Sequence, residues 1–332
     1  MHLLIPHTLC SAFHENEFAR VGATTISDLD STQVNHHGWP VASSVRKVAG
    51  EGPSVAVTAS VNVKQVESLL HALQDLRTDA SAVMVCGCEP IPSDLRANIP
   101  ASLHGLLRRP QPTDLIFLTA ELLNEALANE SVLDVALRHN AIGLAVRGPV
   151  ESSRLPEPGP GRPTVELSAL RAAIQQALAE VQAGEMQRKC LEAGLLLLWD
   201  FLDESHAISQ TMEGKGTPRT ADYWHAIMHR REPDLGNAAY WFRRLGNHPA
   251  FESMGSRLPD WLRDTSSPAE EHSRALDSVL ESGTFAPLAM IELCRAAQKA
   301  PSTAAADSYR RIQYLELLNL LLHPYSRTSG AG

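Results

Sequence analysis

The sequence has few cysteines and lacks long apolar runs. Five cysteines occur among 332 residues, an odd number without the spacing of a disulfide framework, which favours a reducing compartment. Cys86 and Cys88 are separated by one residue, which is not the spacing of a redox or zinc pair. The longest apolar run, Leu195 to Trp199, is far shorter than the ~20 residues of a membrane-spanning helix. Because the first residues also lack the basic segment of a secretory signal, we expect a cytoplasmic protein without a membrane partner.

Positive charge is also scarce. The chain has 29 lysines and arginines against 38 acidic residues, a formal net charge of −9. An acidic chain repels nucleic-acid phosphate, so we expect no nucleic-acid partner. No glycine-rich nucleotide loop and no Gly-x-Ser-x-Gly turn follows a predicted strand, so no nucleotide cofactor is predicted.

The first 150 residues alternate short apolar strands with helical patterns. The predicted strands are residues 2–5, 54–59, 82–86, 114–118 and 141–146, and the predicted helices are residues 64–76, 121–128 and 132–139. This alternation predicts an α/β domain over residues 1–150 with an open, mainly parallel sheet. Residues 151–163, which contain four prolines and two glycines, cannot continue a helix and predict a linker.

Helical periodicity dominates the rest of the chain. Residues 164–327 predict an all-α domain, and residues 328–332 predict a disordered tail. The expected helices after the linker are residues 167–181, 185–211, 222–231, 237–244, 268–282, 287–299 and 305–322. Asn237 is placed to cap its helix, and Gly246 and Pro249 are placed to end it.

Two segments of the second half carry the same polar pattern. The first contains Asp203, His206, Gln210 and Glu213, and the second contains Asp222, His225, His229 and Glu232. The steps of three, four and three residues keep each set on one helix face. The break at residues 214–218 is short, so the two helices could pack antiparallel with these faces together.

Three interpretations of this pattern remain open. Helical bundles hold metals with carboxylate and imidazole groups one turn apart, so His206, His225, His229 and Glu213 could bind Zn, Fe or Mn. Without a metal, the three histidines could act as catalytic acids and bases, oriented by Asp203 and Asp222. The third interpretation is a pair of solvated helix faces with weak local ion pairs.

The same region could bind an anion. Nine of the seventeen aromatic residues lie between Trp199 and Trp261, and aromatic side chains such as Trp224 and Trp241 could line a small-ligand pocket or simply fill a helical core. Guanidinium groups bind carboxylates and phosphates, or pair with acidic residues on the surface. The predicted substrate-binding residues are Trp224, Arg230, Arg231, Asn237, Trp241, Arg243 and Arg244.

Residues 223–251, YWHAIMHRREPDLGNAAYWFRRLGNHPAF, resemble a motif block of a protein family to which no activity is attached. The resemblance covers about 50 residues and implies no catalytic assignment. A second polar segment, Asn35 to Pro40, contains His36 and His37. Adjacent loop histidines can join a site or remain solvated.

These features favour an enzyme that acts on a small anionic substrate at a site on the helical domain. A non-catalytic protein that binds a ligand or partner for regulation is the alternative, and a scaffold with solvated helix faces is a third possibility. An enzyme requires the three histidines to converge, whereas a scaffold would point them into solvent.

Overall fold

The computed structural model describes residues 2–6, 25–29, 34–37, 39–49, 54–57, 82–86, 91–96, 99–110, 115–145, 154–263 and 269–326. They belong to two compact units: residues 1–90, 100–147 and 164–181 form unit 1, and residues 91–99, 148–163 and 182–332 form unit 2. The expected helix at 64–76, Cys88 and the tail at 328–332 lie outside the described residues. Unlike the expected division, residues 148–163 belong to unit 2 and residues 164–181 to unit 1.

Unit 1 contains a six-stranded sheet with the strand order β2-β1-β3-β5-β4-β6. The strands are β1 (His2–Pro6), β2 (Thr25–Leu29), β3 (Ser54–Val57), β4 (Ala82–Cys86), β5 (Leu115–Thr119) and β6 (Ile142–Ala145). Strands β1 and β2, β1 and β3, and β4 and β6 pair in parallel. Strand β5 runs antiparallel to both of its neighbours, β3 and β4.

The predicted fold class is therefore wrong. The sheet is mixed rather than mainly parallel because β5 runs against β3 and β4, and most of the described chain is helical. The second half is not all-α either, since β7 (Leu280–Glu281) and β8 (Thr284–Phe285) form a short antiparallel pair. An apolar run identifies a buried strand, but the direction of that strand depends on its connections.

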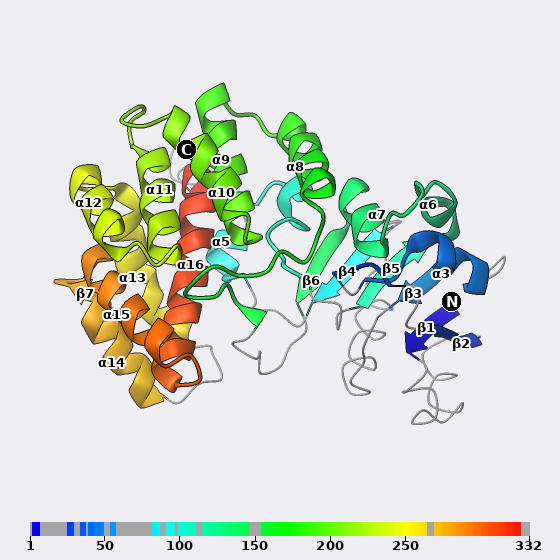
Figure 1. Ribbon diagram of the computed structural model, residues 1–332. Helices are drawn as coiled ribbons and strands as arrows, with labels where there is room; N and C mark the ends of the chain where they lie inside the picture. Colours follow the sequence, from blue (N-terminus) through cyan, green and yellow to red (C-terminus); the bar gives the residue numbers. More distant parts are fainter. Residues whose placement is uncertain are drawn as a thin grey trace. The chain divides into compact units, whose positions relative to one another are not determined.

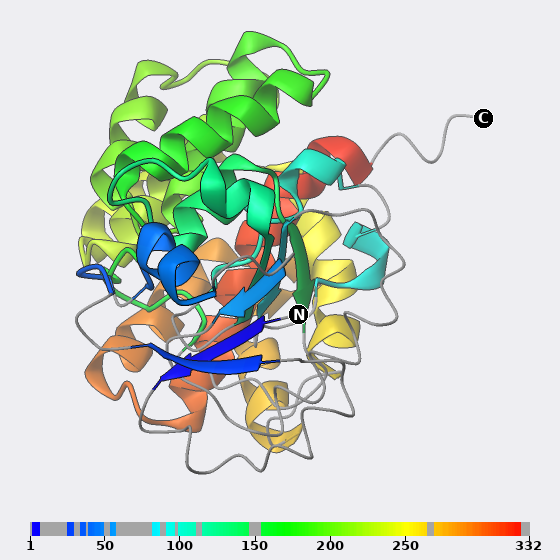
Figure 2. The same ribbon diagram turned by 90° about the vertical axis from the view of Figure 1, so that its right-hand side faces the viewer.

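Helices cover one face of the sheet in unit 1. The helices among the described residues of this unit are α3 (Ala42–Ala49), α6 (Ala120–Asn124), α7 (Val132–Arg138), α8 (Leu167–Glu180) and the short 3₁₀ helix Ala101–Leu103. Figures 1 and 2 show α3, α6 and α7 on the same side of the strands. Helix α7 begins with a capping box, in which Ser131 and Asp134 each accept the other's backbone N–H. Helix α8 packs on α7.

Unit 2 is a helical assembly around one buried helix. Its helices are α5 (Ser93–Arg96), α9 (Glu185–Leu198), α10 (Leu202–Thr211), α11 (Thr220–Arg231), α12 (Leu235–Leu245), α13 (Pro249–Arg263), α14 (Ala269–Val279), α15 (Pro287–Lys299) and α16 (Ala304–Ser326). Helix α16, drawn in red in Figure 1, contacts α9, α13, α14 and α15. Residues 308–322 are all buried, as expected for a helix that has neighbours on every side. None of the described helices has the length and apolar composition needed to cross a membrane.

Two helix predictions in this unit need correction. The expected helix at 185–211 is divided into α9 and α10 because Asp200 adopts a positive φ of 67°, and its buried carboxylate pairs with Arg231. Helix α13 was not among the expected helices, since Pro249 was interpreted only as part of the end of the preceding one. Pro249 instead occupies the first position of that helix, where a missing N–H costs nothing.

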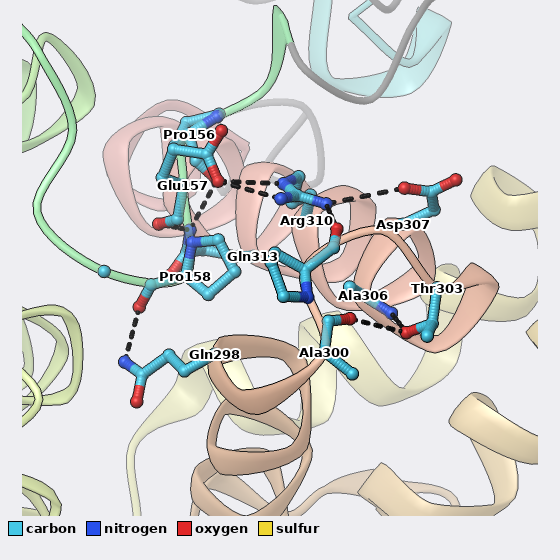
Figure 3. Close-up of polar contacts among 12 residues, drawn as sticks. Pro156, Glu157, Pro158, Gln298, Ala300, Thr303, Ala306, Asp307, Arg310 and Gln313 are labelled. Carbon is cyan, nitrogen blue, oxygen red and sulfur yellow. Dashed lines mark hydrogen bonds and ion pairs between the residues drawn. The ribbon is translucent and has the colours of Figure 1, made fainter.

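The proline-rich segment is fixed on unit 2 by side chains of α15 and α16 (Figure 3). Glu157 Oε2 accepts from Arg310 at 2.9 Å. Gln313 and Gln298 donate to the carbonyl oxygens of Pro156 and Pro158 at 2.9 and 3.0 Å. The segment has no regular secondary structure of its own, so its carbonyl oxygens can accept hydrogen bonds from these side-chain amides.

Candidate functional site

Three histidines from two neighbouring helices meet in unit 2. His206 comes from α10, while His225 and His229 lie one turn apart on α11. Their ring centroids are 4.7 to 5.1 Å apart, and one ligand nitrogen of each lies within 4.8 Å of the others. We call His206, His225 and His229 the histidine group. The packing of α10 against α11 brings the two predicted polar faces together at these residues.

Several polar atoms in this region are buried without a hydrogen-bond partner. They are both ring nitrogens of His225, Nε2 of His206, Oγ of Ser205, Oγ of Ser209 and Oδ2 of Asp222. Most buried polar atoms in proteins have a partner, and leaving one unpaired costs about 1–3 kcal/mol. Such a concentration on α10 and α11 is what a site with a bound ligand or ion would produce.

His225 is the most deeply buried residue of the histidine group. Its ring stacks on Trp241 at a centroid distance of 4.0 Å and an interplanar angle of 28°. Burial and, after it, the charges of His229, His206 and Arg244 lower the pKa of His225 to about 3. The imidazole is therefore neutral near pH 7, with a lone pair available to a metal or a proton.

His229 is held from both sides. Its Nδ1 lies 3.2 Å from Glu232 Oε2, and its Nε2 lies 3.0 Å from the amide nitrogen of Asn237. With Nδ1 donating its proton to Glu232, the Nε2 lone pair accepts from the Asn237 amide, and a metal at Nε2 would take the place of that amide. Burial and His206 lower the pKa of His229, while Glu232 opposes that shift. A carboxylate on the far nitrogen is the usual way to orient a metal-binding histidine.

Arg244 provides a positive charge beside the group. Its guanidinium lies 5.0 Å from the ring centre of Trp241, on the aromatic residue that covers His225. It pairs with Glu213 at 2.9 Å and approaches the Tyr240 hydroxyl at 3.3 Å. The side chain of Arg244 is 39% exposed, so a ligand from solvent can reach it.

Two carboxylates of the predicted pattern are not in the group. Asp203 is exposed in the first turn of α10, and Glu213 lies beyond the end of that helix in its pair with Arg244. Asp222 is buried one turn before His225, and its Oδ1 accepts the N–H of Gly214 at 2.9 Å. Of the expected acidic residues, Asp222 therefore lies deepest, with one oxygen fixed and the other unpartnered.

The predicted role of three buried residues in substrate binding is corrected by the structure. Arg230 and Arg231 are 0% exposed, and they pair with Glu316 and Asp200 respectively. Trp224 is 1% exposed and packs directly over Gly194. These side chains build the interior of unit 2 and do not face solvent. Arg243, in contrast, is exposed in the last turn of α12.

Asn237 does not cap its helix. Asp234 takes that position, and its side chain accepts the backbone N–H of Asn237 at 3.1 Å. The Asn237 side chain instead reaches His229.

Ser205 and Ser209, which are buried on α10, were not predicted from the sequence. Each directly precedes a residue of the polar pattern, His206 or Gln210. Their spacing of four residues, which puts them on one helix face, was the signal that could have identified them.

The chain matches no protein-family model, no curated protein and no solved structure.

Proposed function

We propose that unit 2 binds a divalent transition metal on the histidine group and acts as a metal-dependent enzyme on a small anionic substrate. The observation that carries the proposal is the convergence of three imidazoles whose buried nitrogens include three without a partner. Among the described residues, no carboxylate or thiol joins these three as a fourth ligand. Catalytic zinc sites have three protein ligands and an open position, whereas structural sites have four.

The geometry of the group fits such a metal. Zinc lies about 2.0–2.1 Å from a histidine nitrogen, which puts the nitrogens of a tetrahedral site about 3.4 Å apart. The ligand atoms here lie within 4.8 Å of one another, so side-chain rotation is enough to close the site. His225 is neutral and Glu232 orients His229, and both features favour metal binding.

Neighbouring residues supply what an anionic substrate needs. A metal held by the histidine group would act as a Lewis acid toward a ligand oxygen and lower the pKa of a bound water. The guanidinium of Arg244 would pair with the anion, and the Asn237 amide, displaced from His229 Nε2 by the metal, would donate to it. The unpartnered Oδ2 of Asp222 is the acceptor that we assign to a proton from substrate or water.

Metal binding by His225 tests the first part of the proposal. We expect His225→Ala to lose one equivalent of Zn²⁺ or Co²⁺ in equilibrium dialysis, and to lose the visible absorption of tetrahedral Co²⁺. His248→Asn is a matched control, since His248 is equally buried but lies outside the group. A folded His225→Ala protein that retains full metal content and an unchanged Co²⁺ spectrum would remove the proposed centre.

Anion binding tests the second part. Inorganic phosphate added to the Co²⁺ protein should change its visible spectrum, because the anion would occupy the open position. Arg244→Gln should weaken this binding by about tenfold, the equivalent of ~1.4 kcal/mol. Arg243→Gln, a change to the adjacent exposed arginine of α12, should leave the phosphate affinity unchanged. Equal effects of the two variants would contradict a specific role for Arg244.

A further inference from the structure

A second cluster of metal-ligating side chains lies in unit 1, on residues that the proposed function does not use. His36 Nε2 and His37 Nε2 lie 3.2 and 3.5 Å from the same oxygen of Glu166. The two imidazole centroids are 4.0 Å apart, and the three ligand atoms all lie within 4.8 Å of one another. Two segments about 130 residues apart in the chain therefore present two imidazoles and one carboxylate to a common point.

Hydrogen bonds fix both segments in this arrangement. Asn35 Oδ1 accepts the backbone N–H groups of His37 and Trp39, at 3.0 and 2.9 Å. Trp39 is fully buried, and its indole N–H donates to the carbonyl oxygen of Thr164 at 2.8 Å. Trp39, two residues after His37, is thus bonded to Thr164, two residues before Glu166. This cross-link sets the distance between the histidines and the carboxylate.

The carboxylate of Glu166 does not cap its own helix. Glu166 is the N-cap residue of α8, but its side chain makes no capping hydrogen bond. It points to the two histidines instead. The side chains of His36, His37 and Glu166 are 70%, 15% and 48% exposed, so the group is anchored on one side and open to an ion from solvent on the other.

We propose that His36, His37 and Glu166 form a second divalent-metal site, selective for Zn²⁺-class ions over Mg²⁺ and Ca²⁺. Imidazole nitrogens suit zinc, copper and nickel, whereas magnesium and calcium prefer all-oxygen sites. Two histidines and one glutamate are also a ligand set that zinc uses with an open position. Because the ligands lie on the Asn35 loop and at the N-cap of α8, the ion would join these two parts of unit 1.

Metal stoichiometry of the intact protein tests this site. We expect His37→Ala to lose one equivalent of Zn²⁺ in competition with a chromophoric chelator. Glu166→Gln should weaken binding of that Zn²⁺ ion by at least ~10- to 100-fold. This is the usual effect of losing a residue that only supports a metal ligand. Excess Mg²⁺ should not displace the ion. His37 takes part in the hydrogen bonds of the loop through its backbone N–H, which His37→Ala retains, so the loop should survive the change, and circular dichroism would verify this.

A matched control separates a built site from ordinary surface binding. His139 lies 3.8 Å from Glu125, a histidine–carboxylate pair without a second imidazole, and His139→Ala should keep the full stoichiometry. Equal losses in His139→Ala and His37→Ala, or no loss in His37→Ala, would overturn the proposal. The result is independent of the histidine group, because His225→Ala should remove a different equivalent and leave this one in place.

Discussion

At the scale of single residues, the interior of unit 2 depends on charges that are paired far from water. Arg230 and Glu316 are 0% and 1% exposed, and the Tyr223 hydroxyl also donates to Glu316 Oε1 at 3.0 Å. Removing one partner of a buried pair leaves the other charge without compensation, which costs more than the pair itself contributes. Glu316 therefore joins two helices of the core: α11, through Arg230 and Tyr223, and its own helix, α16.

We expect Glu316→Gln to lower the free energy of unfolding by ~3–5 kcal/mol, because Arg230 would remain buried beside a neutral amide. Urea denaturation followed by circular dichroism would measure the change. The control is Glu270→Gln, which breaks an exposed pair with Arg274 and should change stability by less than ~0.5 kcal/mol. A Glu316→Gln protein as stable as the control would contradict the structural role given to this ion pair.

His248 is a second residue whose protonation state matters for stability. It is fully buried, its Nδ1 accepts the N–H of Ala250 at 3.1 Å, and its Nε2 faces Thr220 Oγ1 at 3.3 Å. Burial and, secondly, His323 lower the pKa of His248 to about 4. The neutral form is thus the one that fits the fold, with Nδ1 as acceptor and Nε2 as donor.

The lowered pKa predicts a loss of stability in mild acid. The unfolded chain protonates His248 near its ordinary pKa of about 6.5, whereas the folded chain does so near 4, so the unfolded state binds more protons between these values. The stabilisation is complete above about pH 6.5 and declines as the pH falls toward 4, by on the order of 3 kcal/mol. In His248→Asn, whose amide oxygen can still accept from Ala250, the unfolding free energy should fall less steeply over this interval. An identical slope in both proteins would refute the assignment.

At the scale of elements, close helix packing depends on a missing side chain at Gly194. A Cβ added there would lie 2.5 Å from Trp224 Cζ2 and 2.7 Å from Leu321 Cδ2. Helix α9 therefore approaches α11 and α16 as closely as it does because residue 194 is glycine. Forcing an extra methyl group into a packed core usually costs 1–3 kcal/mol.

Gly194→Ala should therefore destabilise the protein by about 1–3 kcal/mol in urea denaturation, despite the higher helix propensity of alanine. Gly236→Ala offers a matched comparison, since Gly236 is exposed on α12 and its nearest neighbour, Asp234 Oδ1, would be 3.9 Å from the new methyl group. That change should be neutral or slightly stabilising. If the two variants had the same stability, the contact of α9 with α11 would be looser than the structure shows.

The sequence could predict those helices and strands whose pattern of residues lies within the element itself. The four-residue step from His225 to His229 places both on one face of α11 wherever that helix packs, and strand β4 is recognisable from its own apolar residues. The direction of β5 was not predictable, because it is set by the connections on both sides. The break at Asp200 was missed for a related reason: its carboxylate pairs with Arg231, thirty-one residues further along the chain.

Partners distant in sequence also explain the errors in the candidate site. Arg230 and Arg231 looked like anion-binding residues because arginines at the end of a short helix are usually solvated. Their burial depends on Glu316 and Asp200, and neither acid is close enough in sequence to show the pairing. Arg244, with the same residue type and a similar setting in the sequence, remains exposed. Residue type alone could not separate these cases.

At the scale of the whole molecule, the two proposed metal sites belong to different compact units. The histidine group joins α10 to α11, and the His36–His37–Glu166 cluster joins a loop of unit 1 to α8. A ligand that binds only the folded state stabilises it, by ~2.7 kcal/mol when its concentration is 100 times the dissociation constant. Each ion should therefore protect the elements that it joins, and the two effects should be separable.

Hydrogen exchange would measure this separation. Zn²⁺ should slow amide exchange in α10 and α11 and, separately, in peptides around Trp39 and Val165. His225→Ala should abolish the first effect and preserve the second, while His37→Ala should do the reverse, because no ligand is shared between the two groups. Loss of both effects in either single variant would show that the sites are energetically coupled, and would contradict the independent action proposed for the two units.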